Sequence, residues 1–375
     1  MTATIRSTGC SVSEPMLYVA FELSQRDWKM ALTSGFGVAP WVRTVPAGAL
    51  SEVADVIAQA RRRFGLPAAR VVSCYEAGRD GFWIHRALIQ LGVANRVIDS
   101  ASIEVSRRAR RAKTDRLDAV KLVMLLVRVV AGDRLAWREV RVPTVAEEAA
   151  RHRSRERTAL VQEQTRLINQ MRSWVVLHGT RLPRGRRGAW WTALRDWSGA
   201  PVPSTVQARL ARADERWTLL ETQLDALETQ EQIAAAAAPP ASALGRLVQL
   251  KGVAATSATV LLDEGLVWRA FRNRRQIGGL LGFNPVPYAS GDVVRDQGIS
   301  HAGNPRLQSI SIQLAWNWVR WQPQSALSQW YRLRFGDGKR ARRIGIVAVA
   351  RRLVIALWRY VTTGLVPSGA ILKAA

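Results

Sequence analysis

The chain has 375 residues, of which 55 are Lys or Arg and 29 are Asp or Glu, so its formal net charge is +26. This excess favours a polyanionic partner, and the content of 48% hydrophobic residues excludes a disordered chain and allows about two to three domains. Two cysteines cannot form a disulfide framework, and three arginines interrupt the most apolar stretch, residues 344–366. We therefore expect a cytoplasmic nucleic-acid-binding protein without a membrane-spanning segment.

Residues 15–135 are predicted to form an α/β domain. Short runs rich in apolar and β-branched residues alternate with segments of helical periodicity. The predicted strands are 17–23, 27–32, 41–45, 69–76 and 96–99, and the predicted helices are 50–64, 82–91 and 114–130. Three strands, a helix, a strand, a helix, a strand and a helix form the element order of the ribonuclease H-like fold, which includes RuvC.

Residues 145–233 are predicted to form two antiparallel helices. The second carries a heptad seam, formed by Val206, Leu210, Ala213, Trp217, Leu220, Leu224 and Leu227. The first has a weaker seven-residue repeat, and the basic, aromatic segment 181–191 lies between the two as a loop. We interpret this region as a coiled-coil segment, and the seam predicts self-association into a dimer or larger oligomer.

Residues 242–375 are predicted to form a third, mainly α-helical and basic domain. Residues 234–241, AAAAAPPA, precede it and have the composition of a helix end followed by a linker. The segment 250–264, LKGVAATSATVLLDE, has a glycine turn before a small-residue helix. Backbone N–H groups at such a turn could hold a phosphate, although an ordinary helix N-terminus is an equally good interpretation.

Four acidic residues are candidates for a metal site. Glu22 and Glu76 end predicted strands, and Asp115 and Asp118 lie on one face near the start of a predicted helix. In a ribonuclease H-like arrangement these four meet at one edge of the sheet. Their mutual repulsion would require a cation, and oxygen ligands suit Mg²⁺ or Mn²⁺.

A further candidate is a serine in the segment 282–316. Ser290 and Gly291 lie in a stretch rich in Pro and Gly that we predict to be a loop, and GISHAGNPRL follows and leads into a helix. An exposed serine there could attack phosphorus, but no His or Asp partner is evident, so a turn serine remains the simpler interpretation.

Cationic side chains and turn residues supply the predicted nucleic-acid contacts. The densest group is RRARRAK at 107–113, directly before Asp115, where bound phosphates would lie beside the acidic site. The predicted contact residues are Arg107, Arg108, Arg110, Arg111, Lys113, Arg184, Arg186, Arg187, Gly252, Asn304, Arg306, Lys339, Arg340, Arg342 and Arg343.

These motifs together resemble the IS-one-ten family of insertion-sequence transposases. VAFELSQRDWKMAL, CYEAGRDGFWIHRAL and RRAKTDRLDAVKL resemble the three acidic motifs of its DEDD-type N-terminal domain. LKGVAATSATVLLDE, the ASG at 289–291 and GISHAGNPRLQS resemble its C-terminal transposase domain. The resemblance covers nearly the whole chain and is least specific in the helical middle.

The resemblance implies a recombinase that excises and inserts its own element under the guidance of a non-coding bridge RNA. It implies that Ser290 attacks DNA to form a 5′-phosphoserine link, and that Glu22, Glu76, Asp115 and Asp118 form a RuvC-like Mg²⁺ site. DNA, a guide RNA and further copies of the chain are then the expected partners.

The sequence departs from the family pattern at Glu22, because the family has Asp there and Glu carries one more methylene. Two alternative functions therefore stay open. One is a metal-dependent nuclease of the junction-resolvase type that hydrolyses DNA without a serine nucleophile. The other is an inactive copy of a transposase that only binds nucleic acid.

Overall fold

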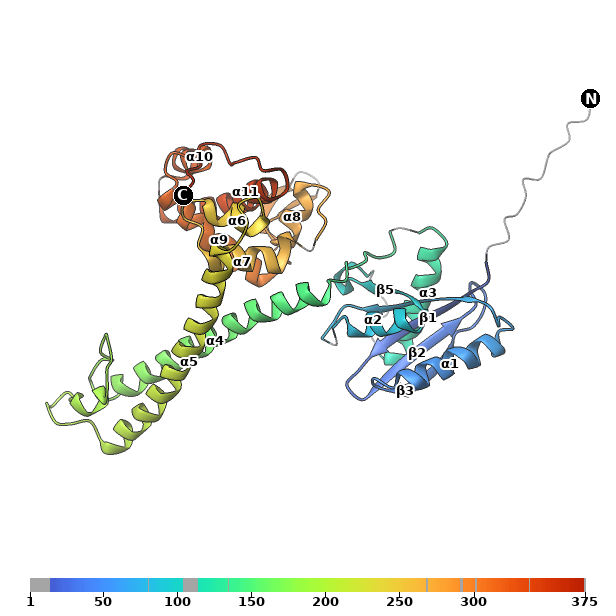
Figure 1. Ribbon diagram of the computed structural model, residues 1–375, viewed down its shortest axis with the longest axis horizontal. Helices are drawn as coiled ribbons and strands as arrows, with labels where there is room; N and C mark the ends of the chain where they lie inside the picture. The colour runs from blue at the N-terminus through green and yellow to red at the C-terminus, as the bar shows by residue number, and fades with distance from the viewer. Residues whose placement is uncertain are drawn as a thin grey trace, which may run out of the picture. The chain divides into compact units, whose positions relative to one another are not determined.

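The computed structural model describes residues 14–79, 81–103, 114–133, 135–267, 269–290, 293–300, 302–336 and 338–373, with the backbone alone at 101, 288–290 and 293–296. The chain divides into two compact units, Met1–Pro143 and Thr144–Ala375, here called unit 1 and unit 2. The helical segment 145–233 and the region 242–375 both belong to unit 2. Figure 1 shows the elements of each unit in chain order.

Unit 1 contains a five-stranded mixed sheet. Its elements are β1 (Met16–Leu23), β2 (Asp27–Thr33), β3 (Trp41–Pro46), α1 (Leu50–Arg63), β4 (Arg70–Glu76), α2 (Trp83–Gln90), β5 (Ala94–Ile98), η1 (Ser100–Ser102) and α3 (Asp115–Val130). This confirms the predicted order of strands and helices. The strand order in the sheet is β3-β2-β1-β4-β5. β2 is antiparallel to β1 and β3, whereas β4 is parallel to β1 and β5.

Both faces of this sheet are covered by helices. Alternate residues of β1 point to opposite faces, so Val19 and Phe21 join a cluster with residues of α1 and α2. Tyr18 and Ala20 join a second cluster with residues of α3, among them Leu122. Burial on both faces explains why β1 and β4 each have five consecutive buried residues rather than alternating ones.

Unit 2 begins with two long helices, α4 (Val145–Val176) and α5 (Ser204–Ala236), which pack along each other and which we call the helical arm (Figure 1). The short helix η2 (Trp190–Ala193) lies between them. Thr144 and Glu147 form a capping box at the start of α4. The predicted helix pair is therefore confirmed.

The heptad seam of α5 packs within the chain. Its residues Leu210, Ala213 and Leu220 form one cluster with Leu167 and Met171 of α4. The seam therefore already has an apolar partner. Self-association remains a prediction, but the seam no longer supports it.

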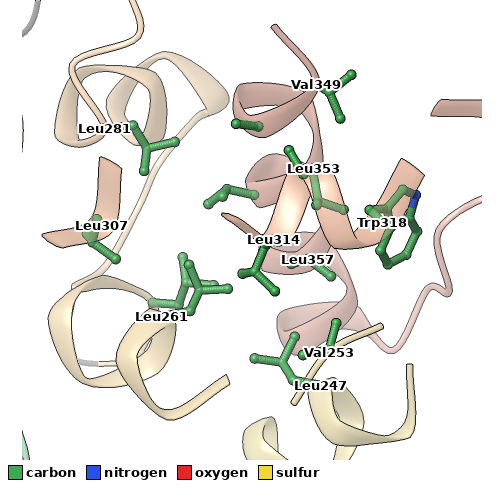
Figure 2. Packing of buried hydrophobic residues seen from close by; sticks show 14 of the residues in the cluster. Leu247, Val253, Leu261, Leu281, Leu307, Leu314, Trp318, Val349, Leu353 and Leu357 are labelled. Carbon is green, nitrogen blue, oxygen red and sulfur yellow. The ribbon is translucent and has the colours of Figure 1, made fainter. Parts of the chain in front are cut away.

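The rest of unit 2 is mainly helical. Its elements are α6 (Ala243–Gln249), α7 (Ala255–Leu261), the π-helix η3 (Leu262–Leu266), α8 (Arg274–Leu280), β6 (Pro285–Ser290), β7 (Val293–Ile299), α9 (Pro305–Trp321), α10 (Ala326–Phe335) and α11 (Lys339–Thr363). α9 and α11 pack together through Leu314, Trp318, Leu353 and Leu357, the centre of the core in Figure 2. α5 ends at Ala236, within the predicted helix end, while both sides of this interval belong to unit 2.

The structure corrects one prediction in this region. Ser290, predicted to lie in a loop, ends β6, which pairs with β7 in a two-stranded antiparallel sheet where Ser290 lies opposite Val293. β6 tolerates Pro285 and Pro287 because it has only one neighbouring strand. On its other edge no backbone N–H has to donate a hydrogen bond, and proline has none to donate. Across the described residues, no helix has the length and hydropathy to cross a membrane.

Candidate active site and nucleic-acid interface

Glu22 and Glu76 lie on the face of the sheet that α3 covers. The parallel register pairs Phe21 with Tyr75, so these two glutamates are the next residues of neighbouring strands. Residues two positions earlier, Ala20 and Cys74, belong to the α3 cluster. Because side chains in a strand repeat every second residue, both carboxylates point to the α3 side at the carboxyl ends of β1 and β4.

Asp115 and Asp118 lie in the first turn of α3, where Thr114 caps the helix by accepting from the Leu117 N–H at 3.3 Å. They precede the buried residues Ala119 and Leu122 by four positions, which places them on the sheet-facing side of α3. The helix dipole favours carboxylates at this end. The four predicted acids thus belong to the α3 side of the sheet, with Asp115 exposed to solvent and the other three partly exposed.

The chemistry of these acids fits a hard divalent cation, because every available ligand is an oxygen. Their spacing does not, since in the part of the chain that the structure describes, no group of three or more His, Cys, Asp and Glu side chains is close enough to hold a metal ion. The basic run that includes Arg107, Arg108, Arg110, Arg111 and Lys113 lies outside the described residues.

Ser290 is the last residue of β6. Its side chain is outside the described part of the structure, so the backbone alone places it. β6 and β7 form a hairpin, and two backbone hydrogen bonds lie near the end of it that is opposite Ser290. The Ser300 N–H donates to the Asn284 carbonyl at 2.9 Å, and the Asn304 N–H donates to the Leu280 carbonyl at 2.8 Å.

Sequence reasoning missed a buried carboxylate that contacts Asn304 at the start of α9. Glu264 in η3 has a side chain that is 0% exposed. Its Oε1 accepts from Arg155 Nε at 3.0 Å, and its Oε2 accepts from Asn304 Nδ2 at 2.9 Å. Burial alone would raise the pKa of Glu264, but these two bonds and the charges of Arg155 and Arg151 outweigh it and hold the pKa below its ordinary value.

The neighbouring carboxylate, Asp263, behaves oppositely. Burial raises its pKa to about 6, opposed by Arg153, while the negative charges of Glu231 and Glu264 raise it further. Both acids belong to a π-helical turn, a feature often found at functional sites. A sequence signal for this buried carboxylate was available. Two adjacent acids directly follow the mostly apolar segment ATVLL, and when a buried helix continues into such a pair, one of the two side chains faces the interior.

Asn304 and Arg306, predicted to contact phosphate, are placed at the start of α9. The Asn304 Oδ1 accepts from the Arg306 N–H at 3.0 Å and from the Leu307 N–H at 3.3 Å. The Asn304 side chain therefore occupies these two backbone amides, and the contact of Asn304 and Arg306 with phosphate stays a prediction. Gly252 has φ +85° and a Cβ there would lie 3.1 Å from Trp321 Cβ, so this turn requires glycine.

The remaining predicted contact residues divide into exposed and internal ones. Arg184 and Arg187 in the arm loop are exposed. Arg186 stacks over Trp217 at 4.8 Å, and its Nε lies 3.7 Å from Asp214 Oδ1, so it stabilises the arm.

Four exposed cations occupy the start of α11, namely Lys339, Arg340, Arg342 and Arg343. A helix N-terminus disfavours positive charge, so a bound polyanion would offset a local cost there.

Comparison with known proteins defines the class of protein to which these features belong. The chain is 40% identical over 377 residues to "Putative transposase y4rJ" of Sinorhizobium fredii (strain NBRC 101917 / NGR234), which covers 95% of this chain and 94% of that protein. It is 26% identical over 325 residues to "Putative transposase y4qE" of the same strain, covering 77% and 74% of the two chains. It is also 27% identical over 233 residues to "Probable family 20 transposase" of Pseudomonas aeruginosa PAO1, covering 61% and 68%. The protein is thus a DNA transposase, and DNA is its partner.

The family follows from the same comparisons. The sequence model described as "Transposase IS116/IS110/IS902 family" matches residues 245–330, a range that contains Glu264, Ser290 and Asn304. Together with the near full-length similarity to y4rJ, this shows that the chain belongs to this family of transposases. The resemblance expected from the motifs is confirmed at the level of the family.

Proposed function

We propose that this transposase cuts and rejoins DNA through Ser290, with unit 1 acting as a ribonuclease H-like, RuvC-type domain and with an RNA as its guide. The observation that carries the proposal is that four carboxylates, Glu22 and Glu76 near strand ends and Asp115 and Asp118 in the first turn of α3, belong to elements that pack together in unit 1. The strand order β3-β2-β1-β4-β5, with β2 alone antiparallel to its neighbours, supports the ribonuclease H-like assignment.

The proposed chemistry is a transesterification at phosphorus. The Ser290 Oγ attacks the scissile phosphate, the bond from phosphorus to the 3′ oxygen breaks, and the serine proton ends on that oxygen. The product is a 5′-phosphoserine and a free 3′ hydroxyl. Because one phosphoester replaces another, a 3′ hydroxyl from a second strand can reverse the step and complete strand exchange.

The acids Glu22, Glu76, Asp115 and Asp118 are proposed to take up Mg²⁺ or Mn²⁺ when nucleic acid is bound. The ion would supply positive charge beside the scissile phosphate. The side chains themselves would orient the DNA end. Since their spacing in this structure does not form a metal site, direct titration of Mn²⁺ into wild-type protein and the Glu76→Gln variant tests this part separately.

Guide RNA and DNA are proposed to share the exposed cationic segments. The arm loop carries Arg184 and Arg187, the start of α11 carries four cations, and residues 107–113 add five more. Phosphate contacts of this kind make binding strongly salt-dependent. Sequencing of RNA that copurifies with the chain tests the guide, and random cellular RNA alone would contradict it.

The deciding experiment mixes full-length protein, RNA from the flanks of its element, Mg²⁺ and a donor DNA, and measures a denaturant-stable protein–DNA adduct. Wild type is expected to form the adduct at Ser290, and Ser290→Ala is expected to abolish it. Ser198→Ala, an exposed serine of unit 2, is the matched control. Metal-dependent cuts without an adduct would refute the serine and favour a nuclease, and binding without cuts would indicate an inactive copy.

A further inference from the structure

A chain of hydrogen bonds links Arg155 of the helical arm, through Glu264, to Asn304, which lies five residues after the hairpin that carries Ser290. We propose that Glu264 is a positioning residue for this hairpin, holding Asn304 on one side and Arg155 of α4 on the other. The inference rests on the proposed role of Ser290. The inference gives a role to a buried carboxylate that has no part in the chemistry proposed for Ser290 and for the four acids of unit 1.

The link is built from side chains far apart in sequence. Arg155 lies 109 residues before Glu264 and donates to both of its carboxylate oxygens, at 3.0 Å from Nε and 3.4 Å from the terminal nitrogen. Asn304 lies 40 residues after Glu264 and donates its amide at 2.9 Å. A buried carboxylate is costly unless it is paired and hydrogen-bonded, so Glu264 holds both partners in place.

Asn304 transmits this constraint to the hairpin. Its Oδ1 caps α9, its backbone N–H bonds to the end of α8, and its side-chain amide bonds to Glu264. The preceding glycine, Gly303, has no room for a side chain, since a Cβ there would lie 2.3 Å from the Gly282 nitrogen. β7 ends at Ile299, five residues before Asn304, so we infer that the position of Asn304 restrains this end of the hairpin.

Stability alone is a weak reason for such a link. A buried ion pair is often no more stabilising than apolar residues of similar volume, and one role attributed to such pairs is to specify one geometry. η3 is a π-helix, an uncommon turn that follows α7 and carries Glu264 into the interior, where 0% of its side chain is exposed. Both features indicate that the position of the Glu264 carboxylate matters more than a regular α-helix at this point of the chain.

The test is Asn304→Ser in the full-length chain with its RNA. Serine is also a good N-cap, so α9 keeps its cap oxygen while the amide donor to Glu264 is lost. Asn273→Ser is the matched control, because Asn273 caps α8 in the same way, accepting from the Arg275 and Gln276 amides.

Loss of a hydrogen bond to a charged group predicts an adduct rate at saturating DNA that is roughly tenfold lower, with DNA affinity changed less than about twofold. Hydrogen exchange of the β7 amides is expected to be about tenfold faster for the same reason. Glu264→Gln keeps an oxygen acceptor for Asn304 and is expected to lie between Asn304→Ser and wild type in both measurements.

Two results would overturn the inference. One is wild-type exchange and adduct rate in Asn304→Ser. The other is an equal loss in Asn273→Ser, which would reduce the effect to helix capping. If wild type forms no serine adduct, the proposed function fails, and hydrogen exchange of β7 still decides whether Glu264 positions the hairpin.

Discussion

Protonation of Asp263 is expected to couple the stability of unit 2 to pH near neutrality. Its pKa in the folded chain is about 6, raised from 3.8 by burial, with Glu231 and Glu264 adding to the shift and Arg153 opposing it. The folded state therefore binds this proton more tightly than the unfolded state. The stability that the proton contributes is complete below about pH 4 and is lost as the pH rises through about 6.

The magnitude follows from the size of the shift. About two pKa units correspond to at most about 3 kcal/mol, and since Asp263 is only half-buried, solvent screening reduces this to about 1–2 kcal/mol. Asp263→Asn is neutral at every pH. We therefore expect it to stabilise the chain by about 1–2 kcal/mol at pH 7.5 and by only about a third as much at pH 4.5.

The assay is urea unfolding of the full chain, followed by tryptophan fluorescence at pH 4.5, 6 and 7.5. Asp225→Asn, at an exposed position of α5, measures the effect of removing one carboxylate from the same unit without burial. The reasoning would be refuted if the difference in unfolding free energy between wild type and Asp263→Asn stayed constant from pH 4.5 to 7.5. It would also be refuted if the variant were stabilised most at low pH.

Three further predictions concern packing. Gly303→Ala is expected to lower the unfolding free energy by about 1–3 kcal/mol, because its Cβ would meet backbone atoms, whereas Gly279→Ala in α8, with one contact at 3.4 Å, should be neutral or stabilise by about 0.5–1 kcal/mol. Equal thermal shifts for these two variants would contradict this packing. The Cys74 thiol is buried and its pKa is raised by that burial, so in a Cys10→Ser chain a thiol reagent should label it only on unfolding, and fast labelling of folded protein would show otherwise. Leu210→Ala is expected to cost about 2–5 kcal/mol in urea unfolding, and a loss below 1 kcal/mol would mean that the seam does not pack on α4.

The elements of unit 1 were predictable because their signals are local. β1 and β4 are short apolar runs between turn residues, and α3 has the periodicity of a helix with one buried face. The placement of Glu22 and Glu76 also followed, since both end parallel strands. The distances among the four acids could not be predicted, because they depend on the exact packing of α3 against the sheet.

The hairpin of Ser290 was harder to predict. Its prolines and glycines are typical of loops, and only pairing of β6 with β7 makes the same residues a sheet. The role of Glu264 was also hidden. Nothing next to it in sequence indicates that its partners are Arg155 and Asn304, which come from α4 and from the N-terminal end of α9.

By itself, the sequence determined the family, the order of strands and helices in unit 1 and the position of the cationic segments, because motifs and periodicity are recorded along the chain. Only the tertiary structure decided which residues of the chain contact one another. It showed that the heptad seam of α5 packs on α4 of the same chain, that the Asn304 side chain caps α9, and that Glu264 joins Arg155 of the arm to Asn304. These pairings join residues up to 109 positions apart, and packing of distant elements rather than local pattern selects them.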